Sequence, residues 1–450
     1  MGPSKIIIDT DPGIDDVLAM LLAFSAKPEE LDILMLSLTF GNVEVQNCLR
    51  NVVTLFHHIE KERAWRKANG RAPGFETLDV RKPIVAVGAE EPLAEHMMVA
   101  DFFHGVDGLG GIHGTHPHLS PEETWKSLFL PTPENLSAEE AAALEAVKEK
   151  HKLFVPSLKP AHEVMLQILA ENEPDTVTIV AVGPLTNLAI AAAKDPETFL
   201  RVKEVVVMGG AVEAPGNMTP GAEFNTYADS VASARIFALT CPNPRMTMPP
   251  VLSGHTKQQL PPYPRNSANS SKSNSSRSVT TFLTPFLTPI LISALDITEH
   301  HLLPATLFKS HTTSPPVAGS PLAEWATLFL NATFEKNLSL NPQQDRSNMG
   351  LQLHDPLTVW YASCAAHEGW EFKTEDLRVE TSGQWTRGCI VADRRGRPIT
   401  EGQGDLEEDA LGDAGGWRDS RKGNRVAWCT KSPGTEVFAA HLLERVFGKV

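Results

Sequence analysis

Four acidic side chains directly follow the first apolar strand of the chain. The three isoleucines at positions 6–8 predict a short buried strand, and residues 9–16 then read DTDPGIDD. The Pro-Gly pair predicts a turn, and the apolar spacing from Asp16 to Ser25 predicts a helix. The four carboxylates are therefore expected between the end of a buried strand and the start of a helix.

Such a crowd of carboxylates needs a counter-charge. A helix N-terminus stabilises an exposed anion by up to about 1 kcal/mol, whereas partly burying several like charges costs several kcal/mol per ion. Oxygen ligands in this number are typical of a hard divalent cation such as calcium or magnesium. The alternative is that Asp15 or Asp16 only caps the helix and the others face water. Capping needs one such residue and not four, so we favour a metal site.

The rest of the chain alternates short β-branched runs with helical patterns. Strands are expected at residues 33–39, 176–182 and 202–208, and helices at residues 43–59 and 185–193. This alternation predicts an α/β fold with a mainly parallel central sheet flanked by helices, in an open Rossmann-type arrangement. Such sheets bind ligands at the carboxyl ends of their strands, so the chemistry is expected there.

Four stretches interrupt this alternation, and we interpret them as insertions in a single domain that spans residues 1–450. They are residues 61–77, 115–152, 250–290 and 402–423. The third is rich in Ser and Asn and cannot bury enough apolar surface to offset its ordering entropy, so we expect disorder there. Within the second, residues 137–150 predict a charged helix.

Composition narrows the class of ligand. The 40 basic and 55 acidic residues leave a net charge of −15, which would repel a nucleic-acid polymer. A small neutral substrate or a cation fits better. The five cysteines show no C-x-x-C spacing, and no segment reaches the about 18 apolar residues of a membrane helix. We therefore expect a cytoplasmic protein with no membrane partner.

The acidic motif resembles the N-terminal signature of the inosine-uridine-preferring nucleoside hydrolase family, and further pieces match that family in the same order. They are Gly41-Asn42, His104-Gly105, Gly183-Pro184-Leu185-Thr186-Asn187, Val207-Met208-Gly209-Gly210, Asn217, Glu223-Phe224-Asn225 and His354-Asp355-Pro356. The resemblance covers most of the chain outside the insertions. It implies a calcium-dependent enzyme of nucleoside catabolism or salvage, usually a homo-oligomer, that hydrolyses the N-glycosidic bond of ribonucleosides.

The resemblance also implies individual roles. Calcium would be bound by the carboxylates of Asp11, Asp16 and Asp355 and by the backbone carbonyl of Val182. Asp11 would also take a proton from a calcium-activated water that attacks the anomeric carbon, and His354 would donate a proton to the leaving base. The residues expected to bind substrate are Asp15, Asn42, His104, Met208, Asn217, Glu223 and Asn225.

Several of these residues have plainer alternatives. His354 before Asp-Pro is also typical of a helix or loop residue, and His104 could simply solvate a turn. Glu223 and Asn225 could be ordinary surface residues. The histidines at positions 113, 116 and 118 suggest zinc, but Pro117 interrupts them and no helix supports that spacing.

Two other functions remain open at this point. A magnesium-dependent phosphatase of the haloacid dehalogenase type also begins with a strand and D-x-D. That family needs a hydroxyl or small residue two positions after its second Asp, which is Gly13 in this chain, and a later catalytic lysine. The two further carboxylates would repel its phosphate. The second alternative is an inactive ligand-binding protein on the nucleoside hydrolase scaffold.

The chain also departs from the family pattern in two places. Residues 335–354 are rich in Asn, Gln and Ser where the family usually places aromatic side chains over the base, and Phe334 is the nearest aromatic residue. The preferred base therefore stays open. The Ser/Asn-rich insertion precedes a strand that we expect to end at Leu295-Asp296, which it could disturb.

Overall fold

A computed structural model of the chain describes residues 2–133, 135–249, 289–340, 349–364, 368–402, 406 and 408–450. The stretch at 250–290 that we expect to be disordered lies outside the described residues, apart from its last two positions.

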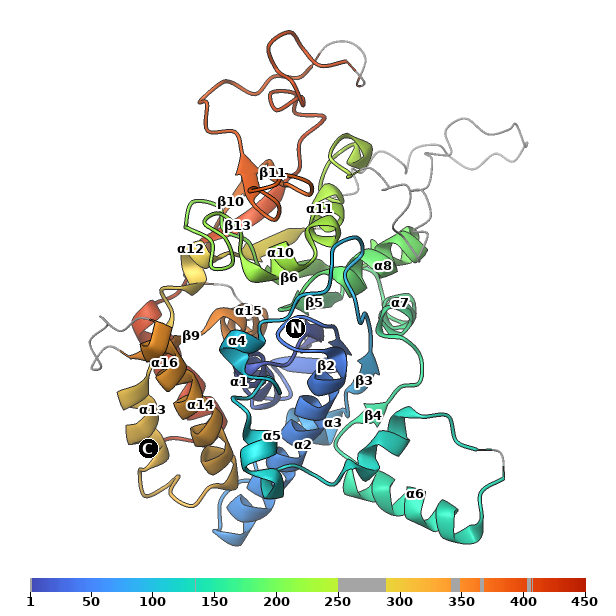
Figure 1. The fold of residues 1–450 in the computed structure, drawn as a ribbon, viewed down its shortest axis with the longest axis vertical. Coiled ribbons are helices and arrows are strands. Elements are labelled where there is room, and N and C mark those ends of the chain that lie inside the picture. Colours follow the sequence, from blue (N-terminus) through green and yellow to red (C-terminus); the bar gives the residue numbers. More distant parts are fainter. Residues whose placement is uncertain are drawn as a thin grey trace.

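A nine-stranded sheet forms the centre of the molecule (Figure 1). Its strands are β1 (Ser4–Thr10), β2 (Leu31–Leu38), β3 (Ile84–Val87), β4 (Val155–Pro156), β5 (Val177–Ala181), β6 (Glu204–Met208), β7 (Ile290–Ser293), β10 (Glu371–Glu375) and β13 (Val426–Lys431). They lie in the order β10-β13-β7-β6-β5-β1-β2-β3-β4. All neighbours are parallel except the edge pair β10 and β13. This confirms the predicted α/β fold with a mainly parallel, open sheet.

Both faces of the sheet are buried, which explains why its strands are almost continuously apolar. Ile6 and Ile8 pack into one core and Ile7 into the other, because successive side chains point to opposite faces. The first core also holds apolar residues of α1 (Ile14–Phe24), α2 (Val45–Ala68), α13 (Ala305–Thr312), α14 (Pro321–Leu340), α15 (His354–Ser363) and α16 (Thr435–Phe447). The second holds those of α7 (Ala161–Glu171), α8 (Thr186–Lys194), α9 (Pro196–Phe199) and α11 (Ser230–Ala238).

Shorter elements join these layers. The short helices are α3 (Thr77–Val80), α4 (Asp101–His104), α5 (Ile112–Thr115), α10 (Phe224–Ala228) and α12 (Leu295–Thr298), with 3-10 turns at Pro117–Leu119, Glu123–Phe129 and Pro244–Met246. Two small antiparallel sheets pair β8 (Leu302–Pro304) with β9 (Gly350–Gln352), and β11 (Leu377–Val379) with β12 (Ile390–Ala392).

The stretches interpreted as insertions take different forms. Residues 61–68 continue α2, so only residues 69–76 of the first stretch depart from regular structure before α3. In the second stretch, α6 (Ala138–Lys150) confirms the predicted charged helix. None of its residues is buried, and it stands away from the sheet in Figure 1. Most of the described residues of 402–423 are turns and bends beyond β12.

The strand expected to end at Leu295-Asp296 is shorter than predicted. β7 ends at Ser293, and Leu295 begins α12. The backbone N–H of Leu295 turns away to donate to the carbonyl of Gly210, and the N–H of Thr298 closes a helical turn on Ala294. The prediction of a strand through Leu295-Asp296 was therefore wrong, because the chain turns after Ser293 to bond with the loop that follows β6, where the carboxylate of Asp296 accepts the backbone N–H groups of residues 212–214.

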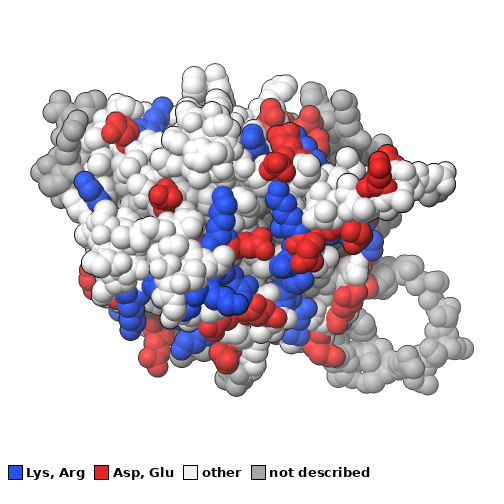
Figure 2. Space-filling view, turned by 90° about the horizontal axis from the view of Figure 1, so that it is seen from below, with Lys and Arg blue, Asp and Glu red and all other residues white. Residues whose placement is uncertain are grey.

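The surface carries mixed charge. On the face shown in Figure 2, lysine and arginine side chains lie interspersed with aspartate and glutamate. No helix in the described ranges is long and apolar enough to cross a bilayer.

Candidate active site

The turn after β1 is built around the carboxylate of Asp16. This carboxylate accepts hydrogen bonds from the hydroxyl of Thr10 at 2.6 Å, the backbone N–H of Gly13 at 3.0 Å and the side-chain amide of Asn42 at 2.8 Å. Asn42 follows β2, which lies beside β1 in the sheet. The hydrogen bond from Asn42 thus connects the acidic motif after β1 to the end of β2.

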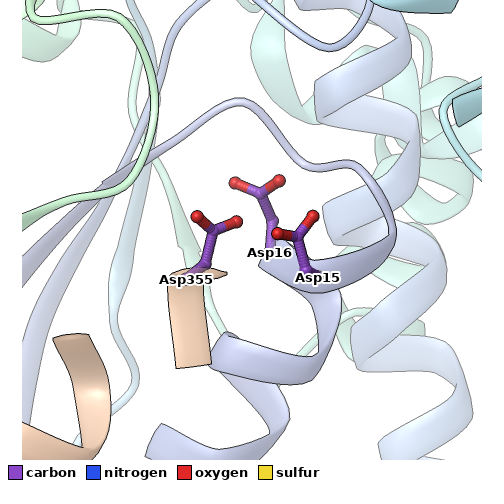
Figure 3. A group of neighbouring side chains, drawn as sticks. All are labelled: Asp15, Asp16 and Asp355. Carbon is purple, nitrogen blue, oxygen red and sulfur yellow. The ribbon is translucent and has the colours of Figure 1, made fainter. Parts of the chain in front are cut away.

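Three carboxylates converge at this edge of the sheet. Oxygens of Asp15, Asp16 and Asp355 all lie within 4.8 Å of one another, and all three residues are buried. Asp15 and Asp16 come from the first turn of α1, whereas Asp355 is the second residue of α15, a helix that packs against α1. Figure 3 shows the three carboxylates facing a common space.

Asp11 lies beside this group at the end of β1. Its Oδ2 accepts the backbone N–H of Asn42 at 2.7 Å, while its Oδ1 is buried without a partner among the described residues. The backbone at Gly41, which follows β2, and at Gly183, which follows β5, lies directly against this carboxylate. A Cβ added at Gly41 would lie 2.0 Å from Oδ2, and one added at Gly183 would lie 2.6 Å from Oδ1. Glycine is needed at both positions because no side chain fits there.

Burial and mutual repulsion disfavour ionisation of this group. They raise the pKa of Asp11 and that of Asp355 well above the usual range, and they raise the pKa of Asp15 to about 7. Burial is the largest cause for each residue, and the charge of a neighbouring aspartate adds to it. An all-oxygen set that is crowded and buried, with Oδ1 of Asp11 left without a donor, fits a hard divalent cation.

A cavity of about 290 Å³ opens above these carboxylates. It is lined by all the residues expected to bind substrate and by part of the expected metal set: Asp15, Asn42, His104, Val182, Met208, Asn217, Glu223, Asn225, His354 and Asp355. Asp11 and Asp16 do not line it and are fully buried. The structure therefore brings every predicted site residue to one cavity or to the layer directly behind it.

Glu223, which also lines the cavity, caps the short helix α10. Its Oε1 accepts the N–H of Asn225 at 2.7 Å, and its Oε2 accepts the N–H of Gly210 at 2.8 Å and that of Thr226 at 3.0 Å. Asn225 in turn donates through Nδ2 to the carbonyl of Val182 at 2.9 Å. Glu223 is buried with both oxygens occupied, so it is not the exposed surface residue of the plainer alternative.

The two histidines of the cavity are both held through Nδ1. Nδ1 of His104 accepts the backbone N–H of Ile14 at 3.3 Å, and Nδ1 of His354 lies 2.7 Å from Oγ1 of Thr298. Burial lowers the pKa of His104 to about 3 and that of His354 to about 4. Both imidazoles are therefore neutral near pH 7, and the low pKa of His354 disfavours an imidazolium acid.

Sequence reasoning missed most of the apolar lining of the cavity. Phe102, Phe103 and Phe224 line it, together with Leu340 and Leu351. Phe102 and Phe103 directly precede His104, so the aromatic pair beside a predicted site residue was a usable signal.

Phe334, the aromatic residue nearest in sequence to the Asn/Gln/Ser-rich stretch, does not line the cavity. Phe334 is 3% exposed and packs in the core with its ring 6.5 Å from that of Phe308. Only part of the Asn/Gln/Ser-rich stretch that follows is described, because residues 341–348 lie outside the described ranges.

The histidines at 113, 116 and 118 do not form a metal site in the structure. Both ring nitrogens of His113 have polar partners, Asn51 at 2.7 Å and Ser120 at 2.5 Å. Within the described ranges, the one group of three close metal-ligating side chains is Asp15, Asp16 and Asp355.

The family model described as inosine-uridine preferring nucleoside hydrolase matches residues 6–431. The chain belongs to this family. Uridine nucleosidase 1 of Arabidopsis thaliana is 36% identical over 234 residues, which are 52% of this chain and 53% of that protein. The chain thus spans about half the length of this relative.

Other relatives match over a longer range. The pyrimidine-specific ribonucleoside hydrolase RihA of Klebsiella pneumoniae is 27% identical over 91% of this chain and 96% of its own length. Among solved structures, a plant nucleoside hydrolase superposes with a TM-score of 0.61 at 24% identity, covering 99% of this chain and 100% of its own. That likeness supports the nucleoside hydrolase fold.

Proposed function

We propose that this protein hydrolyses the N-glycosidic bond of ribonucleosides to ribose and a free nucleobase. The observation that carries the proposal is the group of buried carboxylates at the floor of a cavity whose walls carry amides, two imidazoles and aromatic rings. Family membership supports the same reaction. A cavity of about 290 Å³ is of the size expected for a small ligand.

We propose calcium as the metal. Asp11, Asp16 and Asp355 would bind it through their carboxylates, together with the backbone carbonyl of Val182, and the close approach of Asp15 adds a fourth carboxylate to its surroundings. When bound, calcium would supply positive charge that stabilises these carboxylates as anions, favours loss of a proton from water and attracts the sugar hydroxyls.

Asp11 is the proposed general base. As an anion, its Oδ1 has no competing hydrogen-bond donor among the described residues, so it is free to accept a proton from the attacking water. The attack at the anomeric carbon passes through an oxocarbenium-like state. The neighbouring carboxylates would stabilise its developing positive charge.

The remaining residues would bind and orient the ribose and the base. Asp15, Asn42 and Asn225 would contact the hydroxyls nearest the carboxylate floor, and Met208 would pack beside the ring. Asn217 and Glu223 would hold the 5′-hydroxyl. Of these two, Asn217 also accepts the backbone N–H of Phe224 at 2.9 Å, which fixes its side-chain amide.

The nucleobase would leave along the histidine and aromatic walls. His104 and His354 would donate toward polar atoms of the base, and Phe102, Phe103 and Phe224 would pack against its ring. The relatives named above are described as uridine or pyrimidine enzymes. A pyrimidine ribonucleoside such as uridine is therefore the first substrate to test.

One assay separates this function from the two alternatives. The full chain is incubated with uridine, inosine and uridine monophosphate, with calcium or with a chelator, and reducing sugar and free phosphate are measured. Calcium-dependent release of reducing sugar supports hydrolysis of nucleosides. Phosphate release would support the phosphatase alternative. Binding of uridine without either product would support an inactive scaffold and contradict the proposal.

Cellular location and assembly are secondary proposals. All five cysteines are free, and three of them are buried, which fits a reducing compartment such as the cytoplasm. A homo-oligomer is proposed from family membership, and light scattering on the purified chain tests it.

A further inference from the structure

Thr298, the last residue of α12, lies against the imidazole of His354. Its side chain is 0% exposed, and its Oγ1 is 2.7 Å from Nδ1 of His354. Within the described part of the chain, this nitrogen is the only hydrogen-bond partner found for the hydroxyl. His354 itself lines the cavity, and its Nε2 has no described protein partner.

Two protonation patterns of this contact are possible, and they differ in what happens to the hydroxyl hydrogen. If Nδ1 carries a proton, it donates to Oγ1, and the hydroxyl hydrogen is buried without an acceptor. If Nδ1 is bare, the hydroxyl donates to it and every group in the contact is satisfied. Buried polar hydrogens without a partner are unfavourable and rare, so the second pattern is favoured.

We propose that Thr298 is a positioning residue that keeps the proton of His354 on Nε2 and directs this N–H into the cavity. The identity of the acceptor, a polar atom of the leaving nucleobase, rests on the proposed function. The tautomer does not, because it follows from the protein contact alone. In this tautomer, the bonding electrons of the glycosidic bond leave with the base, and the N–H of His354 stabilises the resulting anion by a hydrogen bond without transferring its proton. The base anion then takes a proton from solvent water.

His104 supplies an internal reference in the same cavity. Its Nδ1 accepts a backbone N–H, that of Ile14, at 3.3 Å. A backbone N–H can only donate. The proton of His104 is therefore also on Nε2, and no change at Thr298 should alter it.

Nitrogen-15 NMR of the full chain labelled at histidine tests the tautomer directly, since protonated and bare ring nitrogens resonate at well-separated frequencies. His354→Gln and His104→Gln variants assign the signals. In the native protein we expect Nε2–H for both residues. Thr298→Val, which keeps the shape and removes the hydroxyl, should shift the His354 tautomer ratio at least tenfold toward Nδ1–H. Thr298→Ser should retain the native ratio, and His104 should stay unchanged in every variant.

Kinetics then test whether the tautomer matters for the reaction. Thr298→Val should lower kcat for uridine by roughly tenfold with KM changed less than about twofold, because fewer molecules then carry the Nε2–H that stabilises the charge developing on the base. A p-nitrophenyl riboside, whose leaving group needs no assistance, should lose less than about twofold. Thr298→Ser should match the native enzyme on both substrates.

The outcomes separate the two proposals. Nδ1–H in native His354, or an unchanged tautomer in Thr298→Val, overturns the positioning role. An equal loss on both substrates also overturns it, because it indicates general damage to the site. If no nucleoside is hydrolysed by the native chain, the proposed function fails, and the NMR spectra still decide the tautomer.

Discussion

Two buried aspartates at the end of β1, Asp9 and Asp11, occupy different surroundings. Asp9 accepts hydrogen bonds through Oδ1 from the hydroxyl of Ser37 and from the amide of Asn187, the latter at 2.9 Å, in the packing layer behind the cavity. Asp11 does not line the cavity either, but it lies close to the charges of Asp15 and Asp16 directly behind it. Each has one buried oxygen without a described partner.

The two aspartates differ in how many other carboxylates lie close to them. Burial raises the pKa of Asp9 to about 7, and its neighbours Ser37 and Asn187 act only to lower it. For Asp11, the charges of Asp16 and Asp15 add to burial and raise its pKa further. One proton relieves an isolated carboxyl. For a group of four carboxylates, a shared cation would relieve the mutual repulsion more completely. The comparison therefore indicates that crowding, and not burial alone, distinguishes the proposed metal site.

The largest effect is expected for Asp11→Asn, which keeps the shape and removes the charge. Activity toward uridine should fall by about 10³-fold, since the proposed general base is lost. Calcium affinity measured by titration calorimetry should fall as well. Native activity in this variant would show that Asp11 is no more important for the reaction than Asp9, and it would contradict the distinction drawn between the two aspartates.

A smaller loss is expected for Glu223→Gln, because Glu223 is a carboxylate whose oxygens are both occupied by N–H donors. The glutamine amide must face at least one of these donors, which should destabilise the protein by about 1–3 kcal/mol in urea unfolding and raise KM for uridine roughly tenfold. The exposed Glu213 lies on the same loop. Glu213→Gln should change stability by less than about 0.5 kcal/mol.

Calcium should stabilise the protein more at pH 8 than at pH 5.5. The folded metal-free protein holds the pKa of Asp15 near 7, above its ordinary value of 3.8. The stability that this proton contributes is full below pH 3.8 and is lost as the pH rises through 7. Calcium replaces the proton, so the calcium-induced rise in Tm should be larger at pH 8, by roughly 2 °C. An equal rise at both pH values would argue against metal binding at this group.

The smallest effect is expected for Asp9→Asn. The asparagine Oδ1 can keep the hydrogen bonds from Ser37 and Asn187, and its amide replaces the oxygen that has no described partner. Activity should stay within about threefold and stability within about 1 kcal/mol of the native protein. A loss as large as that of Asp11→Asn would mean that the two aspartates form one functional unit.

Local patterns were sufficient to predict the sheet and the position of the acidic motif. The three isoleucines of β1, the Pro-Gly turn and the first helix appear where their spacing indicates. Boundaries were less certain, as the early end of β7 at Ser293 illustrates, because the residues after it respond to packing over β6 and not to their own apolar pattern.

Contacts between distant elements were beyond local reasoning. The approach of Asp355 to Asp16 was implied by the family resemblance, whereas nothing in either segment signalled the contact of Thr298 with His354. The sequence pattern likewise gave no sign that Phe334 is buried in the core away from the cavity. Each of these depends on how α12, α14 and α15 pack on the sheet.

The amino-acid sequence by itself determined that carboxylates would follow a buried strand and open a helix, because strand, turn and cap preferences act over a few residues. Only the tertiary structure decided which of them meet Asp355, which histidine nitrogen faces the cavity and which aromatic rings line it. The physical reason is that these relations depend on the order of parallel strands and on helix packing across more than 300 residues of chain.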